Sequence, residues 1–232
     1  MLRESKGLNL KNSIAVVNKK SYIRESKKGN SYRIENSRIL NNEVKIYCNS
    51  LETEPNYFKA FAIEVNKSKV SDVRIEVILT QKKGGKDPLY AVKYAIENRG
   101  SCKNTWVVFD KDEFDIEKAI KLARENQVHV AWSNECFELW ILLHFRLVEI
   151  AIGRKECLIK VKEFLKKEMK LDYTKNNKDI YEKLKSKLRI AIANAKRQHQ
   201  LIKRDGVLPN RANPCTTVYE LVEHLVQRID EE

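Results

Sequence analysis

Two aspartates that follow a short apolar segment are the best-placed candidates for chemistry in this sequence. Asp110 and Asp112 come after residues 106–109, Trp-Val-Val-Phe, whose large and β-branched side chains are typical of a buried strand. In open α/β sheets, ligands bind beyond the carboxyl ends of the strands, where these acids would lie. Two carboxylates that turn toward one point suit Mg²⁺ or Mn²⁺ better than zinc. The alternative is an exposed loop that caps a helix beginning near Asp115.

A third candidate, Glu138, lies in an apolar helix predicted over residues 133–145. Six large apolar side chains accompany it: Phe137, Leu139, Trp140, Leu142, Leu143 and Phe145. An unpaired carboxylate would be costly in such surroundings, so Glu138 must be protonated, ion-paired or bound to a metal. From the second turn of this helix it can reach the strand end that carries Asp110 and Asp112. The alternative is a core glutamate paired with an arginine or a backbone amide.

Alternating strand and helix patterns position these acids. Strands are predicted at residues 44–48, 73–79, 106–109 and 127–132. Helices are predicted from Pro55, from Pro88 to about Asn98 with Asp87 as its cap, and from Asp115 to Asn126. This order implies parallel strands joined by helical crossovers.

The remaining sequence differs in character. We interpret residues 1–42 as a basic, partly flexible arm, 43–145 as an α/β domain, and 146–232 as a basic helical extension packed on it. In the extension, two basic amphipathic helices are predicted over 155–170 and 178–203, and a last helix runs from Thr216 or Thr217 to near Ile229.

Charge is unevenly distributed along the 232 residues, whose formal net charge is +13. Residues 1–42 hold 10 basic and 3 acidic side chains and residues 146–206 hold 18 and 8, whereas residues 43–145 hold 15 and 16. Basic flanks around an acidic, metal-type site suit a protein that cleaves phosphodiesters. The alternatives are an anionic lipid surface, for which the first segment lacks a clear amphipathic helix, and a protein that is merely basic.

Four lysines near the predicted strand ends are the candidate nucleic-acid contacts. Lys82, Lys83 and Lys86 lie in a glycine turn before a helix, where free amides could receive a phosphate, and Lys111 lies between the two aspartates. Most such turns are only connections. The five cysteines have no CxxC spacing, which indicates reduced thiols. No signal peptide and no apolar run of roughly 20 residues is evident, so we expect a cytoplasmic protein without membrane partners.

Four motifs, in this order, resemble the RloB-like family over roughly residues 43–228. They are Cys48 with Thr53-Glu54-Pro55-Asn-Tyr-Phe58, Val107-Val-Phe-Asp110-Lys-Asp112, Ser133-Asn with Cys136-Phe-Glu138-Leu-Trp and Leu-Leu-His144-Phe, and Asn213-Pro214 with Thr216-Thr. That family is similar to Toprim-domain proteins. The resemblance implies an α/β fold with a compact, mainly parallel Toprim-like sheet, helices on both faces, and a helical C-terminal extension.

The same resemblance implies a function. A related Toprim subunit of a bacterial defence system acts with an ABC-like ATPase and cleaves tRNA. By resemblance, this chain would be an anti-phage effector nuclease that uses Mg²⁺ or Mn²⁺ to cleave RNA, with tRNA favoured, or DNA. An ATPase partner is expected, and an oligomer is possible. Asp110, Asp112 and Glu138 would hold the metal, and Glu54 would join them as a catalytic residue.

One departure from the family pattern concerns the first strand end. Where the family commonly has Cys-Glu-Gly-Glu, this chain has Cys48-Asn49-Ser50-Leu51. Asparagine carries no charge and cannot exchange a proton, so either Glu54 or Glu52 replaces the missing glutamate, or Asp110, Asp112 and Glu138 hold the metal alone in a weakened site. The alternative function is a catalytically impaired Toprim module that binds nucleic acid or an ATPase without cutting. A strand-passage enzyme is disfavoured, because nothing resembles the tyrosine-bearing domain that it needs.

Overall fold

The computed structural model describes residues 42–67, 73–80 and 87–230, all within the unit Leu40–Glu232. The predicted arm therefore lies almost entirely outside the described residues. In the described part, five strands form one sheet in the order β2-β1-β3-β4-β5. The strands are β1 (Glu43–Cys48), β2 (Arg74–Leu79), β3 (Asn104–Asp110), β4 (His129–Asn134) and β5 (Cys215–Thr216).

The first four strands are parallel, which confirms the predicted mainly parallel α/β sheet. Ile46 on β1 lies opposite both Val77 on β2 and Trp106 on β3. The interior strands β1 and β3 are covered on both faces, which explains their nearly continuous apolar sequences. Because the strands are parallel, their carboxyl ends meet at one edge, where Cys48, Asp110 and Asn134 end β1, β3 and β4.

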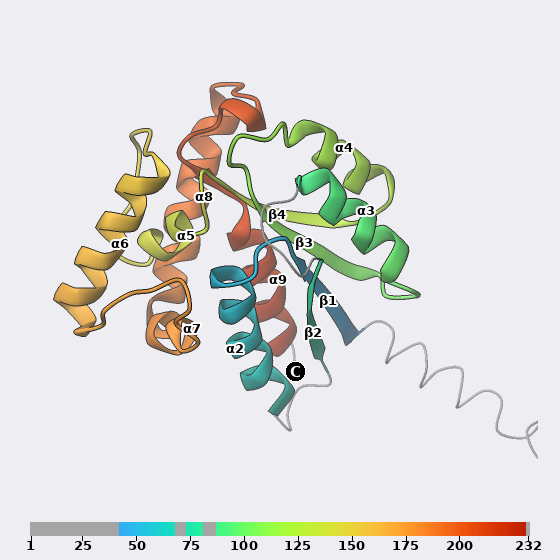
Figure 1. The fold of residues 1–232 in the computed structure, drawn as a ribbon, viewed down its shortest axis with the longest axis horizontal. Coiled ribbons are helices and arrows are strands. Elements are labelled where there is room, and N and C mark those ends of the chain that lie inside the picture. Colours follow the sequence, from blue (N-terminus) through green and yellow to red (C-terminus); the bar gives the residue numbers. More distant parts are fainter. Residues whose placement is uncertain (1–41, 68–72, 81–86, 231–232) are drawn as a thin grey trace, which may run out of the picture. The chain divides into compact units, whose positions relative to one another are not determined.

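Helices pack on both faces of the sheet, as Figure 1 shows. One face carries α3 (Pro88–Asn98) and α4 (Glu117–Glu125), and the other carries α2 (Thr53–Lys67), α5 (Glu138–Leu143) and α9 (Val218–Asp230). The Asp87 side chain accepts a hydrogen bond from the Leu89 N–H at 2.8 Å, which confirms the predicted cap of α3. Two separate apolar clusters correspond to these two faces.

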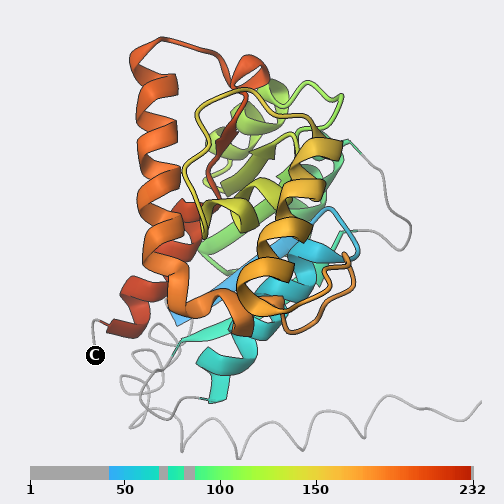
Figure 2. The ribbon, with the colours of Figure 1, turned by 90° about the vertical axis from the view of Figure 1, so that its left-hand side faces the viewer.

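The C-terminal part is helical and packs beside α5, as Figure 2 shows. It contains α6 (Arg154–Met169), α7 (Ile180–Leu184), a 3₁₀ turn (Lys185–Lys187), α8 (Leu188–Arg204) and a second 3₁₀ turn (Pro209–Arg211). The predicted single helix over 178–203 is thus divided at the first 3₁₀ turn. The larger apolar cluster joins residues from the sheet region and from these helices. The proposed division at residue 145 stays a prediction.

Two helix starts and one strand differ notably from the sequence prediction. Helix α2 begins at Thr53, so Pro55 is its third residue rather than its first. Helix α5 begins only at Glu138, because residues 135–137 form a loop after β4, and Glu138 is in its first turn rather than its second. The two-residue strand β5 was not predicted, and it pairs antiparallel with β4 at Ser133 and Asn134.

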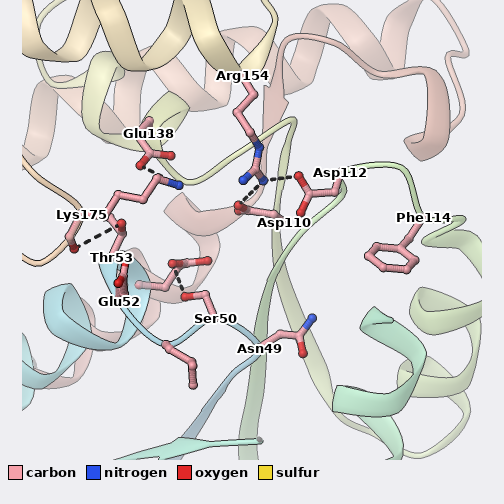
Figure 3. A pocket seen from close by; sticks show the side chains of 12 residues that line it. Asn49, Ser50, Glu52, Thr53, Asp110, Asp112, Phe114, Glu138, Arg154 and Lys175 are labelled. Atoms are coloured by element: carbon pink, nitrogen blue, oxygen red, sulfur yellow. Dashed lines mark hydrogen bonds and ion pairs between the residues drawn. The ribbon is translucent and has the colours of Figure 1, made fainter. Parts of the chain in front are cut away.

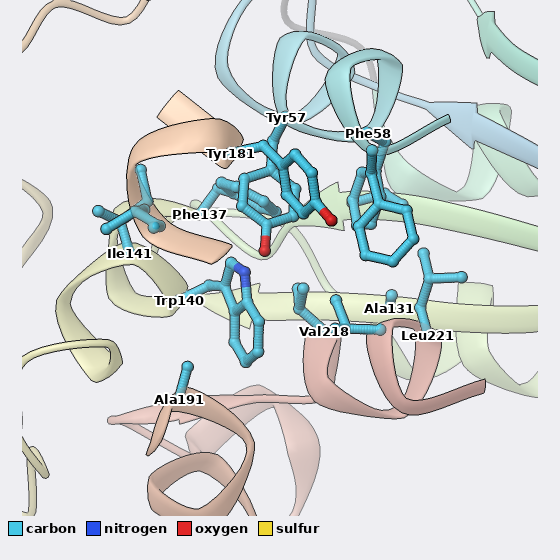
Figure 4. Close-up of a cluster of buried hydrophobic side chains, with 14 of the residues drawn as sticks. Tyr57, Phe58, Ala131, Phe137, Trp140, Ile141, Tyr181, Ala191, Val218 and Leu221 are labelled. Atoms are coloured by element: carbon cyan, nitrogen blue, oxygen red, sulfur yellow. The ribbon is translucent and has the colours of Figure 1, made fainter. Parts of the chain in front are cut away.

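Aromatic side chains fill the core between α2, α5 and α7, as Figure 4 shows. The Tyr57 ring packs edge-on against Phe58, Phe137 and Tyr181, at centroid distances of 5.3, 5.5 and 5.4 Å. Trp140 is fully buried beside them. This packing fixes the helices whose first turns reach the carboxyl edge of the sheet. Within the described residues, none of the helices has the length and apolar character needed to cross a membrane.

Candidate functional site

A cavity of about 360 Å³ lies at the carboxyl edge of the sheet, and Figure 3 shows the side chains around it. It is lined by Asn49, Ser50, Leu51, Glu52, Thr53, Glu54, Asp110, Asp112, Phe114, Glu138, Arg154 and Lys175. All four predicted catalytic acids therefore line one cavity. Two cations from the helical C-terminal part, Arg154 and Lys175, line it as well.

Asp110 and Asp112 share one cation. The Nη2 atom of Arg154 lies 2.9 Å from Asp110 Oδ2 and also forms an ion pair with Asp112 Oδ1. Asp110 ends β3, while Asp112 lies two residues later with a φ of 47°, in the left-handed region that few residues other than glycine adopt. This backbone conformation turns the chain directly after the strand, and both carboxylates reach the same guanidinium. Backbone strain of this kind is common at functional sites.

Glu138 has a partner, as its burial requires. Its side chain is 2% exposed, and Oε1 accepts a hydrogen bond from the Tyr173 hydroxyl at 3.2 Å. The same oxygen lies 3.5 Å from Lys175 Nζ. The Thr53 hydroxyl donates to the Lys175 carbonyl at 3.5 Å, which connects this loop to the start of α2. Of the three states that the sequence left open for Glu138, the structure shows an ion pair.

Glu54 is buried in the first turn of α2. Its Oε2 accepts a hydrogen bond from the Ser50 hydroxyl, whereas Oε1 has no hydrogen-bond partner among the described residues. Asn49, which follows β1, accepts a weak hydrogen bond from the Thr80 hydroxyl at 3.4 Å. Figure 3 shows the Asn49 amide on the side of the cavity away from Lys175. Glu52 also lines the cavity but is exposed to solvent.

Two asparagine side chains from the family-like motifs hold the start of α6 in place. Asn213 receives a hydrogen bond from the Ile152 N–H at 3.0 Å and donates one to the Ile152 carbonyl at 3.2 Å. Asn134 donates to the Ala212 carbonyl at 2.7 Å. The Arg154 N–H donates to Glu135 Oε2 at 3.0 Å, so the loop after β4 caps α6. These bonds direct Arg154 toward the aspartates.

Burial makes the acids of the site weaker acids. Burial raises the pKa of Asp110 well above its usual value, the charge of Glu54 adds to the effect, and Arg154 opposes it. Burial also raises the pKa of Glu54, although the Ser50 hydroxyl opposes this. The pKa of Asp112 is raised by burial too, against the effect of Arg154. Ionising these carboxyl groups together is therefore unfavourable without further positive charge.

The donor types fit a hard divalent cation, but the geometry is not that of a ready metal site. Carboxylate oxygens are the preferred ligands of Mg²⁺ and Mn²⁺, and the buried Oδ1 of Asp110 has no hydrogen-bond partner among the described residues. Across residues 42–67, 73–80 and 87–230, no three acid, histidine or cysteine side chains converge as metal ligands. Arg154 lies where a cation between Asp110 and Asp112 would lie.

None of the four lysines predicted to contact nucleic acid is among the described residues that line the cavity. Lys111 donates to the Asp112 carbonyl at 3.1 Å and does not line the cavity. Lys82, Lys83 and Lys86 lie outside the described residues. Sequence reasoning missed Arg154 and Lys175, because the segment 146–206 holds 18 basic residues and no local pattern distinguishes these two. The only available signal was the buried glutamate, which required a partner.

Comparison with known families supports the motif assignment. The model of the family described as RloB-like protein matches residues 44–225. Neither the comparison with curated proteins nor that with solved structures gives a match. The matched range spans most of the chain and contains all four acids of the cavity. The chain therefore belongs to the RloB-like protein family.

Proposed function

We propose that this protein is a metal-dependent nuclease that hydrolyses phosphodiester bonds in nucleic acid. The observation that carries the proposal is that four acids and two cations line one cavity at the carboxyl edge of a mainly parallel sheet. Acids that hold a divalent cation, beside cations that hold a phosphate, are the parts that phosphodiester cleavage requires. Membership of the RloB-like family and the basic segments of the chain are consistent with it.

Each acid has a role that its environment supports. Asp110, Asp112 and Glu138 would hold Mg²⁺ or Mn²⁺, which supplies charge stabilisation at the phosphate oxygens when bound. Glu54 is buried, which raises its pKa, and it has one oxygen without a hydrogen-bond partner among the described residues, so it is suited to accept or donate a proton. It would thus take the role that Asn49 cannot perform.

We propose RNA, with tRNA favoured, as the substrate, DNA as the alternative, and an ABC-like ATPase as a partner in anti-phage defence. The exposed face of α6 carries Lys155, Lys162, Lys166 and Lys167 along its length, and it can hold a polyanion. The test compares cleavage of tRNA, other RNA and plasmid DNA by the parent protein and by Asp110→Asn, with Mg²⁺ or Mn²⁺, with EDTA, and with and without the ATPase.

The parent is expected to cleave at least one substrate only when metal is present, and Asp110→Asn is expected to lose about 100-fold or more of this activity. Asp172→Asn is the matched control, because Asp172 is exposed and paired with Lys166 at 2.7 Å, away from the cavity. Equal activity of the parent and Asp110→Asn would contradict the proposal. So would inactivity of the parent on every substrate with the ATPase present.

A second candidate function is a binding module that does not cut. It is favoured by Asn49 at the position of the usual glutamate and by the ion pairs of Arg154 with both aspartates. This function predicts salt-dependent RNA binding that is unchanged in Asp110→Asn, with no metal-dependent turnover in either protein. Turnover that requires Asp110 would exclude it.

A further inference from the structure

Arg154 is placed by the fold to hold charge at the cavity without being fixed there. It is the first residue of α6, and its backbone is held by Glu135 and, through Ile152, by Asn213. Its side chain, in contrast, is 38% exposed. The backbone is therefore anchored while the guanidinium can move between the aspartates and the open cavity.

The contacts of the guanidinium are not those of a permanent structural ion pair. Strong arginine–carboxylate pairs use two nitrogens side by side against one carboxylate. Here a single nitrogen, Nη2, serves both Asp110 and Asp112. Asp110 Oδ1 stays buried without a hydrogen-bond partner among the described residues. One monovalent group thus satisfies two carboxylates incompletely, in the place where a divalent cation would satisfy them better.

The charge of the cavity explains why the guanidinium is also needed at the phosphate of a bound substrate. Two cations, Arg154 and Lys175, face the five acids of the lining: Glu52, Glu54, Asp110, Asp112 and Glu138. A phosphodiester would be repelled by this excess of negative charge. A divalent cation at the aspartates would reduce the excess and also release Arg154, which would then be free to bind the phosphate.

We infer that Arg154 is an exchangeable counter-ion: it occupies the metal position in the free protein and binds the substrate phosphate once the metal has displaced it. This inference rests on the proposed function and names how the same site is regulated. Metal binding and phosphate binding then support each other. The metal binds the aspartates and frees Arg154 for the phosphate, and the phosphate binds Arg154 and frees the aspartates for the metal. Lys175 stays beside Glu138 and is not part of the exchange.

The test measures metal binding and RNA binding separately, without turnover. Mn²⁺ binding to the full chain is measured by calorimetry for the parent, Arg154→Gln, Arg154→Lys and Arg197→Gln. Arg197 is the matched control, since it is an exposed arginine that pairs with Glu149 at 3.3 Å outside the cavity. Binding of a fluorescent single-stranded RNA is measured by anisotropy in EDTA and in Ca²⁺.

Arg154→Gln is expected to bind Mn²⁺ about tenfold more tightly than the parent, because the competing cation is gone, and to bind RNA in Ca²⁺ about tenfold more weakly. Ca²⁺ should tighten RNA binding to the parent but not to Arg154→Gln. Arg154→Lys keeps the charge and should bind Mn²⁺ like the parent, as should Arg197→Gln. If Arg154 were merely structural, its removal would weaken the binding of Mn²⁺ and of RNA together.

The outcomes separate this inference from the proposed function. Equal or weaker Mn²⁺ binding by Arg154→Gln, beside measurable binding by the parent, would overturn the inference and leave the nuclease proposal in place. Absence of Mn²⁺ binding in the parent and in all variants would overturn both. A circular dichroism spectrum of each variant shows whether it is folded. If Arg154→Gln is not folded, the parent alone decides: Ca²⁺ that fails to tighten its RNA binding would overturn the inference.

Discussion

Helices α2 and α5 each divide between two environments, the cavity and the aromatic core. Their first turns place Glu54 and Glu138 at the cavity, and the residues that follow, Tyr57 and Trp140 among them, are packed in the core. Glu54 and Glu138 are nearly as buried as the core residues, but core side chains are surrounded by apolar contacts, whereas Glu54 Oε1 has no hydrogen-bond partner among the described residues. The apolar packing of each helix therefore keeps a buried carboxyl group in place in its first turn, although burying that group is unfavourable.

The largest effect is expected from the core. Trp140→Ala should lower the free energy of unfolding by about 3–5 kcal/mol, because a fully buried ring is replaced by a cavity. Urea denaturation followed by circular dichroism measures this. Ile159→Ala on α6 is the control, since Ile159 is 55% exposed and should change stability by less than about 0.5 kcal/mol. A similar small change for both variants would show that the aromatic core does not provide the stabilisation that we assign to it.

Metal should relieve the charge at the cavity. Mn²⁺ at about 100 times its dissociation constant should stabilise the parent by about 2.7 kcal/mol, because only the folded chain brings the acids together. Asp110→Asn should lose this stabilisation, and EDTA should reverse it in the parent. Thermal denaturation with and without the ion measures both. Equal stabilisation of Asp110→Asn would show that the ion binds elsewhere.

Removing one buried charge should stabilise the free protein. The pKa of Glu54 is raised in the folded state by burial, so the folded chain holds this proton more tightly than the unfolded chain. Stability is therefore lost as pH rises above the unfolded pKa. Glu54→Gln should be about 1 kcal/mol more stable than the parent near pH 8, and the gain should disappear near pH 4. A gain that does not depend on pH would contradict this explanation.

The smallest effect is expected from an exposed acid on the same helix. Glu64 on α2 pairs with Lys185 at 2.8 Å, and both side chains are largely exposed. Glu64→Gln should leave stability unchanged or slightly lower, since solvent screens such pairs. Denaturation at pH 8 beside Glu54→Gln measures the difference. Glu54→Gln should thus raise stability, whereas Glu64→Gln, ten residues away, should not.

Local signals were sufficient for most of the fold. The strand that ends at Asp110 and the cap of α3 at Asp87 were predicted from adjacent residues, and the structure confirms them. Strand β5 has two residues and forms only because α8 and the loop after it return the chain to β4, so no local pattern could indicate it. The start of α5 was missed because Cys136 and Phe137, in the loop just before it, are apolar like the helix that follows.

The site was predictable in its acids but not in its cations. Asp110, Asp112 and Glu138 stand out because acids are unusual beside buried apolar residues, and all three line the cavity. Arg154 pairs with Asp110 across 44 residues of sequence, in a segment rich in similar side chains. Only the packing of α6 selects it. Whether the four acids act as catalytic and metal-binding residues stays a prediction.

The paired hydrogen bonds between Asn213 and Ile152 have a consequence for how such proteins can diversify. They bring together the two ends of a segment of about sixty residues, from α6 to the second 3₁₀ turn. A flexible loop within a segment closed at its base can change length at a cost of only about 0.6 kcal/mol for each doubling. Because this segment also supplies Arg154, Lys175 and part of the larger apolar core, only its solvent-facing side can change while the sheet and its acids stay intact. Selection can therefore change the exposed residues that contact a binding partner without changing the acids at the strand ends.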